Sequence, residues 1–245
     1  MKSELPLQFI KYLLCRLILC AVCWPVIAET SGEMQLTPLS DNVWLHVSYK
    51  QVDGFGLVES NGVIVLSDEG SSIIDTPWTA DETLELLAWA KEQGKPVTRA
   101  FSSHWHEDRT AGIAALNDNG VETYASAMTN QILAENGRPQ ALHSINDDVF
   151  LLAPGIEVFY PGRGHAADNS VVWLDDAEIL VGGCLVRGGE TQTLGYTGDA
   201  DLQQWGPSVQ KVLARYGDSA RVVLPGHGAP GDARLLSHTI TLTAQ

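Results

Sequence analysis

The short stretch from Ser103 to Arg109 holds the residue types best suited to chemistry, because it carries two histidines and an aspartate spaced two apart. The pattern is His104-x-His106-x-Asp108. In an extended chain, side chains two residues apart point to the same side, so all three could project together. In a helix, residue 106 would point about 200° away from residue 104. Imidazole and carboxylate groups are zinc ligands, so the stretch predicts part of a metal site at the end of a strand.

Three further candidate ligands stand where predicted strands give way to loops. His165 and His227 lie among glycines, where the backbone can approach a site closely, and Cys184 follows two glycines. A lone histidine in a loop is more often a surface residue than a ligand, so each is weak evidence by itself. The other histidines lack such a context and are assigned structural roles: His46, His143 and His238.

Together the six candidates fall into two chemically sensible sets. Three imidazoles would bind zinc and leave a fourth position open, as catalytic zinc sites do, and they come from His104, His106 and His165. A second set offers oxygen, sulfur and nitrogen, from Asp108, Cys184 and His227. The thiolate favours zinc over magnesium or calcium. The sequence therefore predicts two zinc ions per chain and favours an enzyme. The non-enzymatic alternative is an exported protein that binds zinc but catalyses no reaction.

Strands and helices that would position these residues alternate along the chain. Short apolar runs between turn signals such as Asn61-Gly62 predict antiparallel hairpins over residues 43–75. Helices are predicted over 80–93, 126–135, 202–216 and 233–242. Each half of the chain thus offers several strands and then helices. Two sheets packed face to face with helices outside would bury both apolar faces, so we expect an α/β fold with the site between the sheet edges.

The N-terminus has the pattern of a secretory signal. Lys11 and Arg16 precede an apolar run that ends at Ala28 with residues suited to cleavage. The run is short for a membrane span, so we expect residues 1–28 to be a cleaved signal peptide, with an uncleaved anchor as the alternative. Residues 29–245 would then form a single domain in the periplasm, without stable membrane association.

Cleavage would also change the charge and the cysteine count. The formal net charge of −15 would become −17, which makes nucleic acid an unsuitable partner. Three of the four cysteines would leave with the signal, and Cys184 would remain alone, with no internal disulfide to form. It would be a buried apolar residue, an intermolecular bridge or a metal ligand. A monomer is the default expectation.

Eight motifs follow one another in a fixed order along the part of the chain after residue 43. They are Gly62-Val-Ile-Val-Leu66, Ile74-Asp-Thr-Pro-Trp78, His104-Trp-His-Glu-Asp-Arg109, Tyr160-Pro-Gly-Arg-Gly-His165, Asp168-Asn-Ser-Val-Val-Trp173, Gly182-Gly-Cys184, Gly198-Asp-Ala-Asp201 and Pro225-Gly-His-Gly228. In this order they resemble the metallo-β-lactamases, specifically the two-zinc subclass with a cysteine ligand.

The resemblance implies a fold, an activity and a set of roles. The fold is the αβ/βα four-layer sandwich of that family. The activity is zinc-dependent hydrolysis of the β-lactam amide bond in penicillins, cephalosporins and carbapenems by a zinc-bound hydroxide, which confers antibiotic resistance. The residues with catalytic roles would be His104, His106, His165 and Asp108.

One departure separates the chain from other branches of the same superfamily. Thioester hydrolases and nucleases of this fold typically show His-x-His-x-Asp-His, whereas Arg109 stands here at the last position. The alternative hydrolase function is that of a lactonase or thioesterase of the same fold. Arg109 would hold the anionic ligands through charge-assisted hydrogen bonds, with a surface salt bridge as the alternative. Asp75 is also expected to lie behind the ligands and support them.

The resemblance also predicts a substrate pocket. Arg187 stands where the family usually has a lysine for the substrate carboxylate. Tyr196 aligns with the family's asparagine, and its phenol would either donate a hydrogen bond or block the position. Val52, Phe55 and Trp78 are expected as apolar walls. Phe55 could belong to a mobile lid over the site or to a hairpin tip that packs inward. Trp78 could instead pack in the hydrophobic core.

Overall fold

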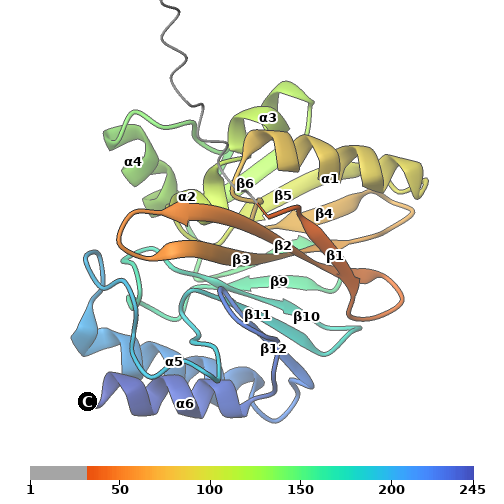
Figure 1. The fold of residues 1–245 in the computed structure, drawn as a ribbon. Helices are drawn as coiled ribbons and strands as arrows, with labels where there is room; N and C mark the ends of the chain where they lie inside the picture. The colour runs from red at the N-terminus through yellow and green to blue at the C-terminus, as the bar shows by residue number, and fades with distance from the viewer. Residues whose placement is uncertain (1–31) are drawn as a thin grey trace, which may run out of the picture.

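Two β-sheets lie face to face between two layers of helices in the computed structural model, which describes residues 32–245. Figure 1 shows α1 and α3 over the outer face of one sheet and α5 and α6 over the outer face of the other. The expected four-layer αβ/βα sandwich is therefore confirmed. The expected signal peptide, residues 1–28, lies outside the described residues.

The first sheet has seven strands in sequence order. It runs antiparallel from the first strand to the fourth and parallel from the fourth to the seventh. The strands are β1 (Gln35–Pro38), β2 (Val43–Val52), β3 (Gly56–Val65), β4 (Ser71–Ile74), β5 (Val97–Ser102), β6 (Glu122–Ser126) and β7 (His143–Ile145).

The second sheet has five strands in the order β12-β11-β10-β9-β8. Its strands pair antiparallel except for the parallel pair of β11 and β12. The strands are β8 (Val149–Ala153), β9 (Ile156–Phe159), β10 (Val171–Leu174), β11 (Ile179–Gly183) and β12 (Val222–Pro225). The antiparallel hairpins predicted over residues 43–75 are present, but the first sheet as a whole has three antiparallel and three parallel strand pairs.

Four of the six helices in the described part of the chain make the outer layers (Figure 1). The outer helices are α1 (Ala80–Glu92), α3 (Ile113–Asp118), α5 (Leu202–Tyr216) and α6 (Arg234–Thr243). The others are α2 (Glu107–Thr110) and α4 (Ala127–Glu135). Side-chain caps start three of them, at Thr79, Ser126 and Asp201. No helix among residues 32–245 is both long and apolar enough to cross a bilayer.

Successive residues of the central strands enter different cores, which explains the continuous apolar runs in these strands. Val63 and Val65 pack between the sheets, whereas Ile64 packs under α1. On the other side, Val181 faces the space between the sheets and Leu180 faces the helices α5 and α6. Side chains alternate across a strand, so a sheet covered on both faces needs continuous apolar runs.

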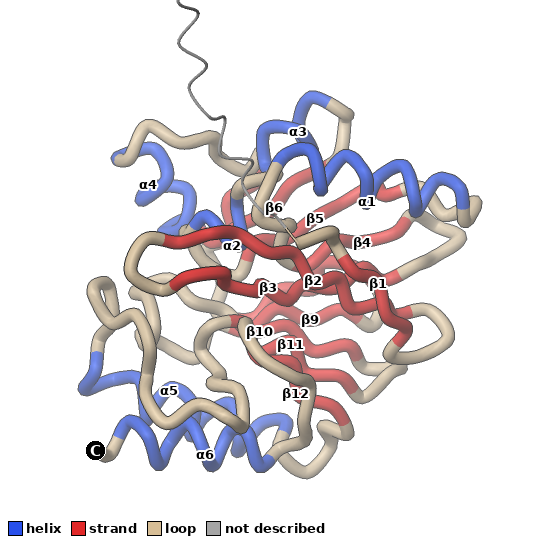
Figure 2. Tube along the Cα trace, in the orientation of Figure 1, coloured by secondary structure: helices blue, strands red, loops and turns tan. Residues whose placement is uncertain are grey.

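The loops that leave these strands gather on one side of the sandwich. Figure 2 shows long loops on the left of the view, beside the tip of the β2–β3 hairpin and the short helix α2. Every predicted ligand lies at or beside such a loop, so this side carries the candidate site.

Candidate metal centre and active site

The six predicted ligands come from five places in the fold and meet at one edge of the sandwich. His104 and His106 follow β5, and Asp108 lies in α2. The others follow strands of the second sheet: His165 lies between β9 and β10, Cys184 comes directly after β11, and His227 comes shortly after β12. Because β11 and β12 run parallel, their carboxyl ends deliver Cys184 and His227 to the same edge.

The three predicted imidazoles form the first ligand triad. His104 Nε2 lies 3.1 Å from His106 Nδ1, which lies 3.0 Å from His165 Nε2. Zinc–nitrogen bonds of about 2.0–2.1 Å at tetrahedral angles place ligand nitrogens about 3.3 Å apart. Burial and then the neighbouring imidazoles lower the pKa of His104 and His165 well below the usual value. These rings are therefore neutral, with lone pairs free for a metal.

The mixed ligands form the second triad. Cys184 Sγ lies 3.5 Å from Asp108 Oδ2 and 3.3 Å from His227 Nε2, and His227 Nε2 lies 3.4 Å from Asp108 Oδ2. Tetrahedral zinc with one sulfur ligand places these atom pairs about 3.3–3.6 Å apart. Atoms of His104, Asp108 and Cys184 also lie within 4.8 Å of one another, so the two triads adjoin.

Asp108 reaches this position from a helix, which corrects the expectation of three ligands on one extended face. The chain turns after β5, His106 takes the N-cap position, and α2 starts at Glu107. Asp108 lies in the first turn and is buried like Cys184, whereas the His227 side chain is 25% exposed. The turn brings its carboxylate to Cys184 Sγ and His227 Nε2, so one motif contributes residues to both triads.

Arg109 is fully buried beneath the second triad. Its Nη2 lies 2.8 Å from Asp108 Oδ2, 3.2 Å from Cys184 Sγ and 2.8 Å from the Gly226 carbonyl. Nη1 donates to the Asn61 carbonyl. The alternative interpretation, a surface salt bridge, is therefore wrong, and the guanidinium contacts two of the predicted ligands as expected. Gly226 has no room for a side chain, since a Cβ there would lie 2.6 Å from Cys184 Sγ and 2.8 Å from Arg109 Nη2.

This guanidinium sets the charge of its neighbours. Burial alone would raise the pKa of Asp108, but Arg109 and then His227 hold it well below its usual range, so the carboxylate stays ionised. Burial raises the pKa of the Cys184 thiol far above its ordinary value despite Arg109. A thiol so buried loses its proton to water when a cation binds at the sulfur and stabilises the thiolate.

Asp75 supports the site from behind the first triad. Its carboxylate accepts from the Ser103 amide at 2.7 Å and from the Ser103 hydroxyl at 2.9 Å. Ser103 Oγ in turn lies 3.3 Å from His104 Nδ1. Burial raises the pKa of Asp75 to about 6, against the opposing effect of Arg109. Its φ of 62° is in the left-handed region, an uncommon backbone for a residue other than glycine, next to a ligand loop.

Asp199 is a site residue that carried no predicted role. Its Oδ2 lies 3.0 Å from His106 Nε2, on the opposite side of the ring from the triad nitrogen. Likewise the Glu59 carbonyl lies 2.5 Å from His227 Nδ1. Such partners orient metal-ligating imidazoles and fix their tautomer. The sequence signal for Asp199 was its place in the Gly198-Asp-Ala-Asp201 motif.

A cleft of about 820 Å³ opens onto both triads, and all five predicted pocket residues line it. Phe55 at the hairpin tip is 58% exposed, so it is not packed inward. Trp78 is both buried and part of the wall. Tyr196 packs edge-on against His106, with 5.8 Å between ring centres. The roles of these residues and of Arg187 and Val52 in substrate binding stay predictions.

The histidines assigned structural roles have partners outside both triads. His46 Nε2 binds the Asp75 carbonyl at 3.0 Å, His143 pairs with Glu122, and His238 binds the Thr191 carbonyl at 2.9 Å. Burial lowers the pKa of His46 to about 3, so it is neutral.

Comparison with known proteins agrees with this geometry. The model of the Metallo-beta-lactamase superfamily matches residues 55–227. A Metallo-beta-lactamase type 2 from Pseudomonas aeruginosa is 38% identical over 91% of this chain and 92% of its own length, and one from Bacteroides fragilis is 36% identical over 89% and 88%.

Solved structures agree as well. The crystal structure of the DIM-1 metallo-beta-lactamase exposed to ceftazidime is 45% identical, with a TM-score of 0.85 over 87% of this chain and 98% of that one. The mono-zinc form of FIM-1 from Pseudomonas aeruginosa is 35% identical, with a TM-score of 0.81 over 86% and 95%. The family match, these identities and the shared fold lead to one conclusion: the chain belongs to the metallo-β-lactamase family.

Proposed function

We propose that this chain is a zinc-dependent hydrolase that opens the amide bond of the β-lactam ring. The observation that carries the proposal is the pair of adjoining ligand triads at the floor of one cleft. The names of the relatives support the same substrate class. Penicillins, cephalosporins and carbapenems are the proposed substrates, and resistance to them is the proposed consequence for the cell.

The donor sets support two zinc ions per chain. His104, His106 and His165 would hold one, and Asp108, Cys184 and His227 the other. In each set the donor atoms converge at tetrahedral spacing, and neutral imidazoles and a thiolate are the ligands that zinc prefers. When bound, zinc supplies Lewis acidity that polarises a carbonyl and lowers the pKa of water towards neutrality.

Water is the nucleophile that fits the cleft. Among the described residues that line it, no serine, threonine or cysteine is present to form an acyl-enzyme. Hydrolysis then adds water across the amide: a bond forms at the carbonyl carbon, the bond to the ring nitrogen breaks, and the nitrogen gains a proton. The ionised Asp108 carboxylate, held by Arg109, lies at the cleft and can orient the attacking water.

Two residues on the loop after β11 would position the substrate. Arg187 lines the cleft, and its guanidinium offers two parallel donors to the substrate carboxylate. Its Nε is buried without a hydrogen-bond partner in the described structure, so Arg187 has donor capacity to spare. Tyr196 stands over His106, where its phenol either donates to the substrate or limits its size.

The test is turnover of a chromogenic cephalosporin by the purified chain. Zinc-loaded protein should open the ring, a chelator should abolish turnover, and added zinc should restore it. A lactone and a thioester substrate run in parallel would separate the alternative hydrolases. Absence of cephalosporin turnover by zinc-loaded protein would overturn the proposal.

We also propose that the chain is exported to the periplasm after cleavage at Ala28 and acts there as a monomeric single domain of residues 29–245. The pattern of basic residues, apolar run and small residues supports this. N-terminal sequencing of the mature protein should begin at Glu29, and an intact N-terminus would contradict the export proposal.

A further inference from the structure

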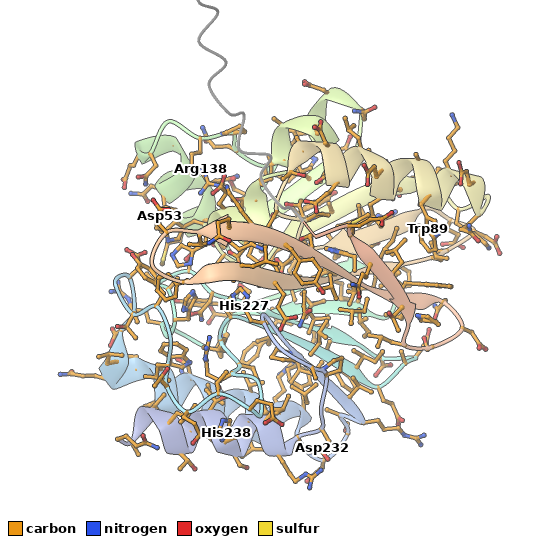
Figure 3. All side chains as sticks on the ribbon, in the orientation of Figure 1. Asp53, Trp89, Arg138, His227, Asp232 and His238 are labelled. Carbon is orange, nitrogen blue, oxygen red and sulfur yellow. The ribbon has the colours of Figure 1, made fainter. Side chains whose placement is uncertain are left out.

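Arg138, in the loop between α4 and β7, reaches back to the first triad. Its Nη1 donates to the Trp105 carbonyl at 2.9 Å, and its Nη2 donates to Thr110 Oγ1 at 2.7 Å. Trp105 stands between His104 and His106, so the guanidinium holds the peptide that joins two predicted ligands. Arg138 is half-buried and lines the cleft, close to the hairpin tip where Asp53 lies (Figure 3).

Thr110 extends this contact to the next peptide group. Its Oγ1 lies 2.8 Å from the His106 carbonyl and 3.1 Å from the Trp105 carbonyl. A hydroxyl has one hydrogen, and because Arg138 donates to the oxygen, that hydrogen must point to the carbonyls. The Thr110 hydrogen is shared between the two carbonyls, with the shorter contact to His106, and the Trp105 carbonyl also accepts the charge-assisted hydrogen bond from Arg138. Arg138 orients Thr110 as well as holding Trp105.

This part of the backbone needs such contacts, because regular structure does not hold it. Residues 103–106 lie after the last residue of β5 and before the first residue of α2. A metal site requires its ligand atoms to be held within about 0.5 Å of the productive geometry. Side-chain contacts from Thr110 and Arg138 take the place that a sheet or helix would otherwise fill.

We propose that Arg138 is a positioning residue for the first zinc site. By fixing the bend at Trp105, it holds His104 and His106 at the spacing that lets them share one ion with His165. The proposal rests on the proposed function, because it takes zinc as the metal of this triad. It predicts that the loss of Arg138 weakens the imidazole site and leaves the Cys184 site intact.

The experiment measures metal binding at each site separately in the full chain. Competition with a chromophoric chelator gives the zinc dissociation constants, and the thiolate-to-cobalt absorption band during a Co²⁺ titration reports the Cys184 site alone. Arg138→Ala should raise the dissociation constant of the imidazole site by about 10-fold or more, the usual effect of losing an outer partner of a metal ligand. The dissociation constant of Arg138→Lys should lie between those of the parent and Arg138→Ala, since one ammonium cannot reproduce the two parallel hydrogen bonds of a guanidinium.

Arg215→Ala is the matched control. Arg215 donates to Glu157 in another part of the fold and does not line the cleft. The control should keep both dissociation constants. Wild-type affinity at the imidazole site of Arg138→Ala, or equal weakening of both sites, would overturn the positioning role. If Arg138→Ala does not fold, wild-type affinity in Arg138→Lys overturns it. A wild-type chain that binds no zinc would instead refute the proposed function.

Discussion

Arg109→Ala removes a buried cation that contacts both an oxygen and a sulfur ligand of the second triad. In the absence of metal, the fully buried guanidinium is the positive charge nearest to the Asp108 carboxylate, at 2.8 Å. Its removal also leaves the Asn61 and Gly226 carbonyls without this donor. Zinc bound at the triad would bring positive charge back to the same carboxylate. The substitution should therefore cost more stability in zinc-free protein than in zinc-loaded protein.

The size of the effect follows from the burial of the pair. Removing one partner of a buried ion pair typically costs about 3–5 kcal/mol. In a chain of this size, each 1 kcal/mol lowers the melting temperature by about 2–4 °C, so zinc-free Arg109→Ala should melt about 6–20 °C below the zinc-free parent. Thermal unfolding by circular dichroism, with and without zinc, measures both differences.

Two results would refute this reasoning. One is a decrease in the free energy of unfolding of less than about 1 kcal/mol in zinc-free protein, which is the range of an exposed ion pair. The other is an equal loss with and without zinc, which would mean that Arg109 does not compensate the ligand charges. Arg234→Ala is the control, because Arg234 is 91% exposed and pairs with Asp232 on the surface. Its melting temperature should match that of the parent in both conditions.

Three further predictions concern the second triad and the cleft. Cys184→Ala should halve the zinc bound per chain and strongly reduce cephalosporin turnover, and unchanged zinc content by atomic emission would refute the ligand role. Arg187→Ala should raise KM for cephalosporins with little change in kcat, and an unchanged KM would count against carboxylate binding there. Because burial raises the pKa of the Cys184 thiol, zinc must displace its proton. Zinc affinity at this site should therefore rise about tenfold per pH unit from pH 6 to 8, measured by chelator competition, whereas a flat profile would contradict a protonated thiol.

The ligands could be predicted because their chemistry is visible locally. His104 and His106 are two residues apart, and Cys184 and His227 each follow a glycine at the end of an apolar run. Apolar runs around Val63 and Leu180 likewise predict sheets covered on both faces. Residue type, spacing and strand ends were sufficient to infer both ligand sets and the layered fold.

Contacts made across long separations could not be predicted in the same way. Asp199 lies 93 residues from His106, and Arg138 lies 33 residues from Trp105, so no local pattern joins them. The turn that places Asp108 in a helix depends on the N-cap position of His106, although a histidine is an unusual cap. The exposure of Phe55 depends on how the β2–β3 hairpin leaves the sheet, which periodicity does not specify.

Anomalous diffraction at the zinc edge, from crystals of the zinc-loaded chain, tests the central claim most directly. That claim is that one short motif supplies ligands to two separate metal ions. We predict two peaks, one among the nitrogens of His104, His106 and His165 and one among the donor atoms of Asp108, Cys184 and His227. A single peak bound by His104, His106 and Asp108 together would contradict the claim.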